Sequence, residues 1–297
     1  MKFIKAFLFG AILCPLALQA QDTLKLYTGA IPNSKVTALT NTGGGQVRRV
    51  TTPILEIYLP EAGKGNGTAV VVIPGGSYQF LSYSGEGVRT AKEFAKNGIT
   101  AFVLKYRLPN DAFMVDKTIG PLQDAQQALK VVRENAAKWG IDATRVGIAG
   151  FSAGGHLAST LATHFQKAYI DNANNTNLRP DFCIVVYPVV SMQDGVTHMQ
   201  SRNNLLGKDA SKALIDEYSN ELKVTAQTPP TYITHTGDDK LVDVDNSIFF
   251  YEALRKNNVP TEMHLYPKGG HGFLIGWAAD RWMPNMLTWL KSINMLK

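Results

Sequence analysis

Cysteine is scarce in this chain of 297 residues, which holds only Cys14 and Cys183. The first lies in an N-terminal segment that we expect to be removed, so one thiol remains. A single thiol forms no intrachain disulfide and cannot build a thiolate cage for a metal ion. Cys183 stands in the apolar run FCIVVYP and is predicted to be an inert core residue.

The apolar run from Ala6 to Leu18 follows Lys2 and Lys5 and is too short to span a bilayer comfortably. Together with the small residue before Gln21, it has the pattern of a secretory signal peptide over residues 1–20. Leu13 is too bulky for a good lipoprotein signal at Cys14. We therefore expect a secreted or periplasmic protein that begins near Gln21, with no stable membrane insertion after the leader is removed.

Clustered positive charge is also lacking. The formal net charge is +6, and the adjacent basic pairs are Arg48-Arg49 and Arg255-Lys256, which lie far apart in the sequence. A nucleic-acid surface would gather such residues and interleave them with aromatic side chains. We therefore expect no nucleic-acid partner, whereas the sequence leaves the oligomeric state open.

Short β-rich runs alternate with helical patterns after residue 50. The runs span 54–60, 69–74, 99–106, 145–150, 182–190, 231–236 and 262–267. Several are apolar at every position, as strands covered on both faces are. Apolar spacings of three and four predict helices over Leu122 to Trp139 and over Arg281 to Leu296. This alternation predicts a single α/β domain with a mostly parallel central sheet and helices on both faces.

Two segments depart from that rhythm. Residues 22–50 are rich in turn-forming residues and are expected to form an extended N-terminal arm. Residues 191–230 are polar, contain no clear strand and end in TPPTY. We expect them to form an insertion, or partial lid, over the working edge of the sheet.

The stretch GFSAG places Ser152 in a G-x-S-x-G pattern between a predicted strand and a predicted helix. A sharp turn there holds a serine in a strained backbone with its hydroxyl exposed, and the glycines let strand and helix approach closely. The helix N-terminus then favours negative charge beside the serine. Ser152 is therefore a candidate nucleophile, whereas the plain alternative is a small residue at a corner.

A serine hydroxyl needs a base to take its proton. Among the six histidines, His271 stands in GGHGF, a loop after the last predicted strand where an imidazole can reach over the sheet edge. His156 lies one turn into the helix that follows Ser152, where packing is the commoner role. The other four are placed less favourably, in predicted strands, in the insertion or at a helix end: His164, His198, His235 and His264.

A carboxylate must orient that base. The segment HTGDDKLVD follows the next-to-last predicted strand, and loops at the carboxyl ends of parallel strands are where ligand chemistry collects. Asp238, Asp239 and Asp243 are all candidates here. The two that do not act as the acid are expected to form turns, because aspartate readily bonds its own backbone.

Attack on an ester carbonyl creates an oxyanion, which needs backbone N–H groups already aimed at it. The sequence VVIPGGSY runs from a predicted strand into glycines that permit close approach. We expect donors from Gly76 and Ser77, with Gly75 as the alternative in the same loop. Ala153, next to the serine, is expected to supply the other N–H.

From residue 50 onward the chain resembles the α/β-hydrolase family, and more narrowly the secreted esterases that act on acylated plant polysaccharides. The resemblance is carried by IPGGSY, LKYRLP, the long segment PLQDAQQALKVVRENAAKWGIDATRVGIAGFSAGGHLAS, RPDFCIVVYPV, TPPTYITHTGDDKLV and GGHGF. It implies Ser152 as nucleophile, Asp239 as acid and His271 as base, because the family's acid precedes x-x-Val. One departure is Pro74 where many relatives have the histidine of His-Gly-Gly-Gly.

The resemblance implies an esterase that removes small acyl groups, most often acetyl, from an acylated carbohydrate, with no cofactor and no metal. Feruloyl esterase and serine peptidase activities are the alternatives on the same fold. A non-catalytic binding module is disfavoured because no member of the triad is missing. Five aromatic residues near the predicted site are candidates either for stacking on a sugar or for packing: Tyr78, Phe80, Tyr83, Phe273 and Trp277.

Overall fold

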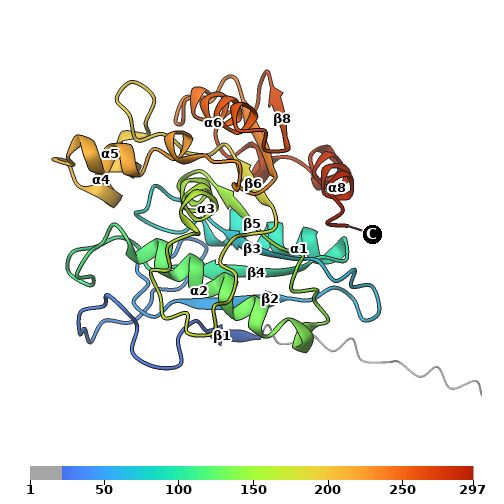
Figure 1. Ribbon diagram of the computed structural model, residues 1–297, viewed down its shortest axis with the longest axis horizontal. Coiled ribbons are helices and arrows are strands. Elements are labelled where there is room, and N and C mark those ends of the chain that lie inside the picture. The colour runs from blue at the N-terminus through green and yellow to red at the C-terminus, as the bar shows by residue number, and fades with distance from the viewer. Residues whose placement is uncertain (1–21, 297) are drawn as a thin grey trace, which may run out of the picture.

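The computed structural model describes residues 22–296, so the predicted signal peptide lies outside the described residues. Within that range the chain forms one eight-stranded sheet in the order β1-β2-β4-β3-β5-β6-β7-β8 (Figure 1). Strand β2 runs antiparallel to both of its neighbours, whereas the pairs from β4 to β8 are all parallel. The predicted mostly parallel sheet is thus confirmed.

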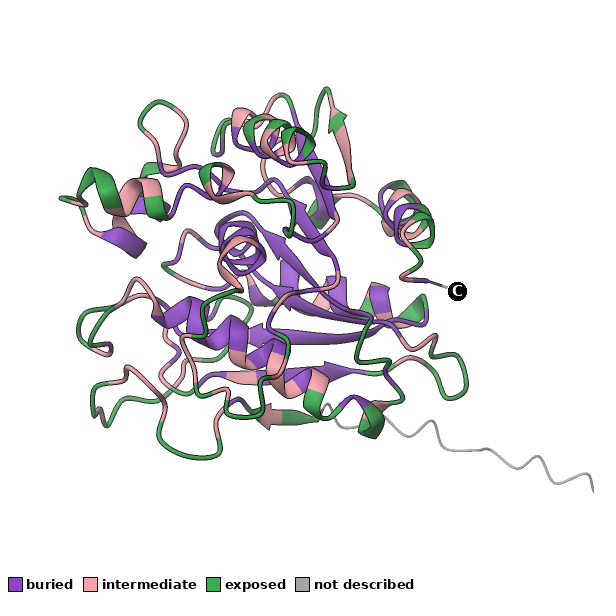
Figure 2. Cartoon of the chain, in the orientation of Figure 1, coloured by how far each residue is buried: buried purple, intermediate pink, exposed green. Residues whose placement is uncertain are grey.

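Each of the seven predicted runs forms a strand. Their bounds are β2 Ile54–Tyr58, β3 Ala69–Ile73, β4 Thr100–Lys105, β5 Val146–Phe151, β6 Cys183–Val186, β7 Thr231–Thr236 and β8 Thr261–Tyr266. The four strands in the middle of the sheet, β3, β5, β6 and β7, are buried along their whole length, and exposure rises toward β1 and β8 (Figure 2). Continuous apolar runs therefore predicted the covered strands β3, β5 and β6, as expected of a sheet with helices on both faces, whereas β7 is buried although its sequence TYITHT is largely polar.

Two strands differ from the prediction. Strand β1, Thr23–Lys25, lies in the predicted arm, where three residues among turn formers gave no strand signal. Strand β6 ends at Val186, although the apolar run continues to Val190. It ends because Tyr187 adopts a φ of 36°, which turns the chain away from the sheet.

The register of the sheet decides which helices cover which face. Phe102 and Gly150 point to one face, where Phe102 contacts Trp139 and Gly150 abuts α3 (Ala153–His164). Val103 and Tyr232 point to the other. On that side lie the segment leading into α1 (Arg89–Lys96) and helix α8 (Met283–Ser292), the latter through Trp289. The predicted placement of helices on both faces of the sheet is therefore confirmed (Figure 1).

The two predicted helices are found with altered ends. Helix α2 covers Gly120–Glu134, and a separate 3-10 turn, η2, covers Ala136–Trp139 and stops at Gly140 with a φ of 64°. Helix α8 is preceded by the short turn η4, Ala279–Arg281. The remaining helices beside the sheet are η1 Tyr83–Val88, α6 Asp245–Lys256 and α7 Phe273–Gly276.

Both irregular segments contact the loop that follows β3. The arm exchanges two backbone hydrogen bonds between Val47 and Leu81, of 3.1 and 2.8 Å. The predicted insertion contains α4 Met199–Leu206, α5 Lys212–Glu217 and η3 Asn220–Lys223. Its α4 reaches the same loop through the Asn204 side chain, which donates to the Ser77 carbonyl at 2.7 Å. A role of the insertion as a lid stays a prediction.

Candidate active site

Ser152 sits at the tight turn between β5 and α3. Its φ is 52°, a value that costs a non-glycine residue energy and aims its side chain out of the turn. The flanking glycines make this possible. A Cβ on Gly154 would overlap the carbonyl oxygens of Ile73 and Pro74, and one on Gly150 would overlap the backbone of Gly154.

The structure brings His271 and Asp239 to this serine. The Nε2 atom of His271 lies 2.9 Å from Ser152 Oγ, and its Nδ1 atom lies 2.7 Å from Asp239 Oδ2. An ionised carboxylate can only accept, so Nδ1 carries the proton and Nε2 is free to accept the serine proton. The three side chains follow the carboxyl ends of β5, β7 and β8. Because these strands are parallel, their carboxyl ends lie on the same side of the sheet.

Asp239 is held as a carboxylate. Burial raises its pKa, but hydrogen bonds from His235, from His271 and from the backbone of Val242 outweigh that effect, so the net pKa lies below its ordinary value. Its Oδ1 accepts the N–H groups of Leu241 and Val242 at 2.8 and 3.0 Å, and its side chain is 0% exposed. The acid is therefore charged and fixed in orientation.

The neighbouring aspartates have turn-forming roles instead. Asp238 Oδ1 accepts the N–H groups of Gly269 and Gly270 at 3.0 and 2.8 Å, which ties down the loop that carries His271. Asp243 Oδ1 accepts the N–H of Asp245 at 2.9 Å as α6 begins. Of the three candidate acids, only Asp239 contacts the imidazole of His271.

The other histidines lie in different surroundings. His156 is fully buried, and burial lowers its pKa to about 4. Its Nδ1 lies 2.8 Å from the Tyr78 hydroxyl and its Nε2 lies 2.9 Å from the Tyr218 carbonyl, so it packs and links segments, as expected. Among residues 22–296, His271 is the histidine with a hydrogen bond to Ser152.

The loop after β3 offers free backbone donors. Gly76, Ser77 and Tyr78 have consecutive positive φ values of 122°, 57° and 59°. In the described part of the chain, the N–H groups of Gly76, Ser77 and Ala153 have no hydrogen-bond acceptor. The N–H of Gly75 is already donated to Glu86 Oε2 at 2.7 Å. The geometry therefore leaves Gly76 and Ser77, rather than Gly75, able to bind an incoming anion.

Three residues of the site were missed by sequence reasoning. Glu86 and Tyr187 lie beneath the loop and the imidazole, and His235 shares Asp239 with His271 through an Nε2 contact of 3.1 Å. Glu86 stands in SGEG, which has the composition of an ordinary turn, and Tyr187 lies inside the predicted apolar run over 182–190. The one available signal was a lone carboxylate set between glycines, eleven positions after Gly75.

The five aromatic candidates divide into two groups. Tyr78, Tyr83 and Phe273 are buried and serve as packing residues. Phe80 and Trp277 remain half-buried, each with a guanidinium over its ring, from Arg48 at 5.3 Å and from Arg281 at 3.5 Å. Phe80 and Trp277 thus keep part of their surface available.

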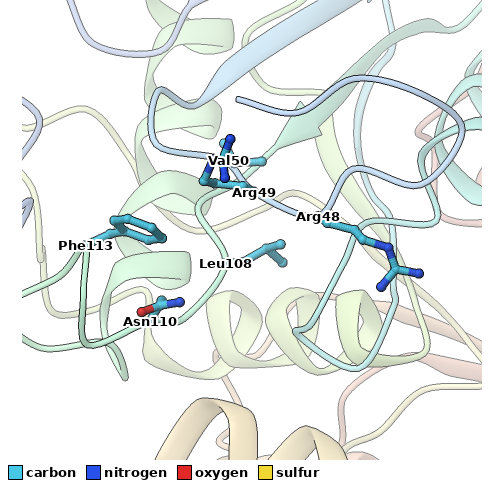
Figure 3. A pocket seen from close by; sticks show the side chains of 6 residues that line it. All are labelled: Arg48, Arg49, Val50, Leu108, Asn110 and Phe113. Carbon is cyan, nitrogen blue, oxygen red and sulfur yellow. The ribbon is translucent and has the colours of Figure 1, made fainter. Parts of the chain in front are cut away.

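A cavity of about 270 Å³ lies between the arm and the segment that follows β4. Figure 3 shows Leu108 between the Phe113 ring on one side and Arg48 on the other. The remaining lining residues are Arg49, Val50 and Asn110, so no member of the Ser152 triad lines it. The lining combines an aromatic ring, an amide and two arginines with the aliphatic side chains of Val50 and Leu108.

Residues 22–296 contain no group of three or more His, Cys, Asp or Glu side chains placed to hold a metal ion. In the same range, no helix combines the length and apolar character needed to cross a bilayer.

The sheet order and the serine turn are those of an α/β hydrolase. Comparison with known proteins places the chain more narrowly: it belongs to the family BD-FAE, whose model matches residues 55–254. A solved structure, the acetyl ester-xyloside bifunctional hydrolase from Caldicellulosiruptor lactoaceticus, superposes with a TM-score of 0.81 at 31% identity. That match covers 93% of this chain and 98% of the other.

Two curated proteins are also similar. The chain is 37% identical to an acetylxylan esterase of Xylanibacter ruminicola, over 97% of this chain and 55% of that protein. It is 36% identical to endo-1,4-beta-xylanase B of Butyrivibrio fibrisolvens, over 72% of this chain and 34% of that protein. The chain therefore spans about half, or less, of the length of these relatives.

Proposed function

We propose that this chain is a serine esterase in which Ser152 is the nucleophile, His271 the base and Asp239 the orienting acid. The observation that carries the proposal is the unbroken series of contacts from Ser152 Oγ to His271 Nε2, at 2.9 Å, and from His271 Nδ1 to Asp239 Oδ2, at 2.7 Å. These distances are those of a nucleophile and base in hydrogen-bond reach, with the base held by a third group.

In the first half-reaction, Ser152 Oγ bonds to the ester carbonyl carbon while His271 Nε2 takes the hydroxyl proton. The N–H groups of Gly76, Ser77 and Ala153 bind the oxyanion. The carbon–oxygen bond to the alcohol then breaks, and His271 returns the proton to the leaving alcohol. In the second half, water gives its proton to His271 and attacks the acyl-serine, which releases the acid and restores Ser152.

We propose acetyl esters of xylan or related carbohydrate as the substrate. An acetylxylan esterase, a xylanase and an acetyl ester-xyloside hydrolase are among the similar proteins. Export of the enzyme, through a leader over residues 1–20, would bring it to such a polymer.

The test compares initial rates on acetylated xylan with those on feruloyl and peptide substrates. Ser152→Ala is expected to lose at least about 10⁴-fold in kcat, since removal of a triad member leaves only binding and oxyanion stabilisation. Ser292→Ala, in α8, is the matched control and should retain full activity. EDTA should not change the rate. Retained hydrolysis by Ser152→Ala would refute the serine mechanism, and a preference for feruloyl or peptide substrates would refute the acetyl assignment.

A further inference from the structure

Glu86 is a buried carboxyl group with no lysine or arginine partner among residues 22–296. It lies in η1, is 4% exposed, and forms no ion pair with any residue of the described chain. A buried carboxyl group with no ion-pair partner is costly and is poorly explained by stability alone. The two hydrogen bonds that Glu86 accepts therefore become its most informative feature.

The first hydrogen bond holds the loop after β3, residues 74–82, which we call the oxyanion loop. Glu86 Oε2 accepts the Gly75 N–H at 2.7 Å, directly before the free N–H groups of Gly76 and Ser77. The loop is pressed against the nucleophile here, because a Cβ on Gly75 would lie 2.5 Å from the Phe151 carbonyl oxygen and 2.7 Å from Ser152 Cβ. A shift at Gly75 would therefore move the oxyanion donors relative to Ser152 Oγ.

The second hydrogen bond supports the base. Glu86 Oε1 accepts the Tyr187 hydroxyl at 3.1 Å, and the Tyr187 ring centroid lies 4.8 Å from that of His271. Tyr187 is fully buried and adopts a φ of 36°, so the chain leaves β6 in a strained turn that places this ring beside the imidazole. The Glu86 carboxyl group thus binds Gly75 in the oxyanion loop and Tyr187, whose ring lies against the imidazole of His271.

We propose that Glu86 is a positioning residue that sets the distance between the oxyanion donors and the His271 imidazole, through Gly75 on one side and Tyr187 on the other. The inference rests on the proposed serine mechanism. It assigns Glu86 no contact with substrate. Its effect is to keep the oxyanion donors after β3 at a fixed distance from the His271 imidazole after β8.

The protonation of Glu86 fits this role. Burial raises the pKa of Glu86, and the net pKa stays above its ordinary value, because the Gly75 N–H, the charge of His271 and the Tyr187 hydroxyl only partly oppose that rise. Both hydrogen-bond donors point at carboxylate oxygens. A glutamine amide would still offer an oxygen to Gly75 and an N–H₂ group to the Tyr187 oxygen, so position and charge can be tested separately.

The experiment measures kcat and KM on an acetyl ester, and the rate of stoichiometric phosphonylation of Ser152, for four variants of the full chain. Glu86→Leu keeps bulk but removes both acceptors. We expect kcat to fall by about 10²-fold, as for the loss of one oxyanion donor, with KM changed less than about threefold and phosphonylation slowed in parallel. Glu86→Gln should restore kcat to within about tenfold of wild type.

Tyr187→Phe keeps the ring and removes its hydroxyl, so kcat should fall while KM is retained. Glu93→Gln, in α1 just after η1, is the matched control and should leave both constants unchanged. A folded Glu86→Leu with wild-type kcat, or a Glu86→Gln as inactive as Glu86→Leu, overturns the proposal. Should Glu86→Leu fail to fold, an unchanged kcat in Tyr187→Phe overturns it instead. Retained activity in Ser152→Ala would identify a failure of the serine mechanism rather than of Glu86.

Discussion

Asp239 serves two imidazoles with one carboxylate oxygen. Its Oδ2 lies 2.7 Å from His271 Nδ1 and 3.1 Å from His235 Nε2, while the Ser247 hydroxyl lies 2.8 Å from His235 Nδ1. His235 Nε2 also lies 3.2 Å from the Val242 carbonyl oxygen, so it carries a proton and donates. His235 therefore fixes the rotation of the carboxylate, and the carboxylate in turn selects the tautomer of His271 that can accept from Ser152.

Replacing Asp239 with asparagine should remove that selection. The amide can donate to Nδ1, which favours the tautomer whose Nε2 carries a proton and cannot act as base. We expect kcat to fall by about 10⁴-fold, measured on an acetyl ester at neutral pH. Asp243→Asn is the control, because Asp243 only starts α6. Comparable losses in the two variants would contradict the assignment of Asp239 as the acid.

The same substitution should change how stability depends on pH. The pKa of Asp239 is lowered in the folded state, so its ionised form stabilises the fold. That contribution is fully present above the unfolded pKa of about 3.9 and is lost as the pH falls toward the folded value. In urea unfolding, the difference between wild type and Asp239→Asn should be largest near pH 7 and shrink below about pH 4. A constant difference would contradict the prediction.

At the level of secondary-structure elements, close contact between α3 and β3 positions Ser152, the proposed nucleophile. Gly154, in the first turn of α3, faces the end of β3, where the oxyanion loop begins. The helix N-terminus can approach that backbone only because position 154 has no side chain. The spacing between Ser152 and the loop is thus set by how closely two elements pack.

Gly154→Ala should force α3 away from β3. The added Cβ would meet backbone carbonyls, which cannot move aside as a flexible side chain can. We expect a loss of about 1–3 kcal/mol in the free energy of unfolding, or more, together with reduced kcat. Gly276→Ala is the matched control, because its Cβ would meet nothing within 4 Å. Thermal unfolding and rate measurements check both variants, and equal behaviour would argue against close packing as the cause.

Periodicity and apolar runs predicted most of the elements, because the buried positions of strands and helices carry mainly apolar side chains. They could not predict where β6 stops. Its apolar run continues past Val186, and only the backbone conformation of Tyr187 ends the strand. Likewise, Ser152 and His271 were predicted from glycine-flanked patterns, whereas Glu86 was not, since its role arises from contacts with residues 11 and 101 positions away.

On the scale of the whole molecule, the oxyanion loop is held by four separate parts of the chain. The arm pairs with it at Leu81, η1 holds Gly75 through Glu86, and α3 holds Tyr78 through His156. The insertion supplies the fourth contact, from Asn204 to the Ser77 carbonyl. A loop with three successive positive φ values is strained, so its conformation depends on these distant supports.

The contact made by the insertion can be tested directly, because Asn204 and Ser77 are 127 positions apart in sequence. Asn204→Ala frees the Ser77 carbonyl, and the peptide units around it can then rotate. Because Ser77 is also a proposed oxyanion donor, we expect kcat to fall by about tenfold with little change in stability. Asn203→Ala, on the same helix but without a hydrogen bond from its side chain in the described structure, is the control. An unchanged kcat in Asn204→Ala would show that the arm, η1 and α3 hold the loop without the insertion. A reduced kcat would indicate that the insertion, residues 191–230, helps to position the proposed oxyanion donors.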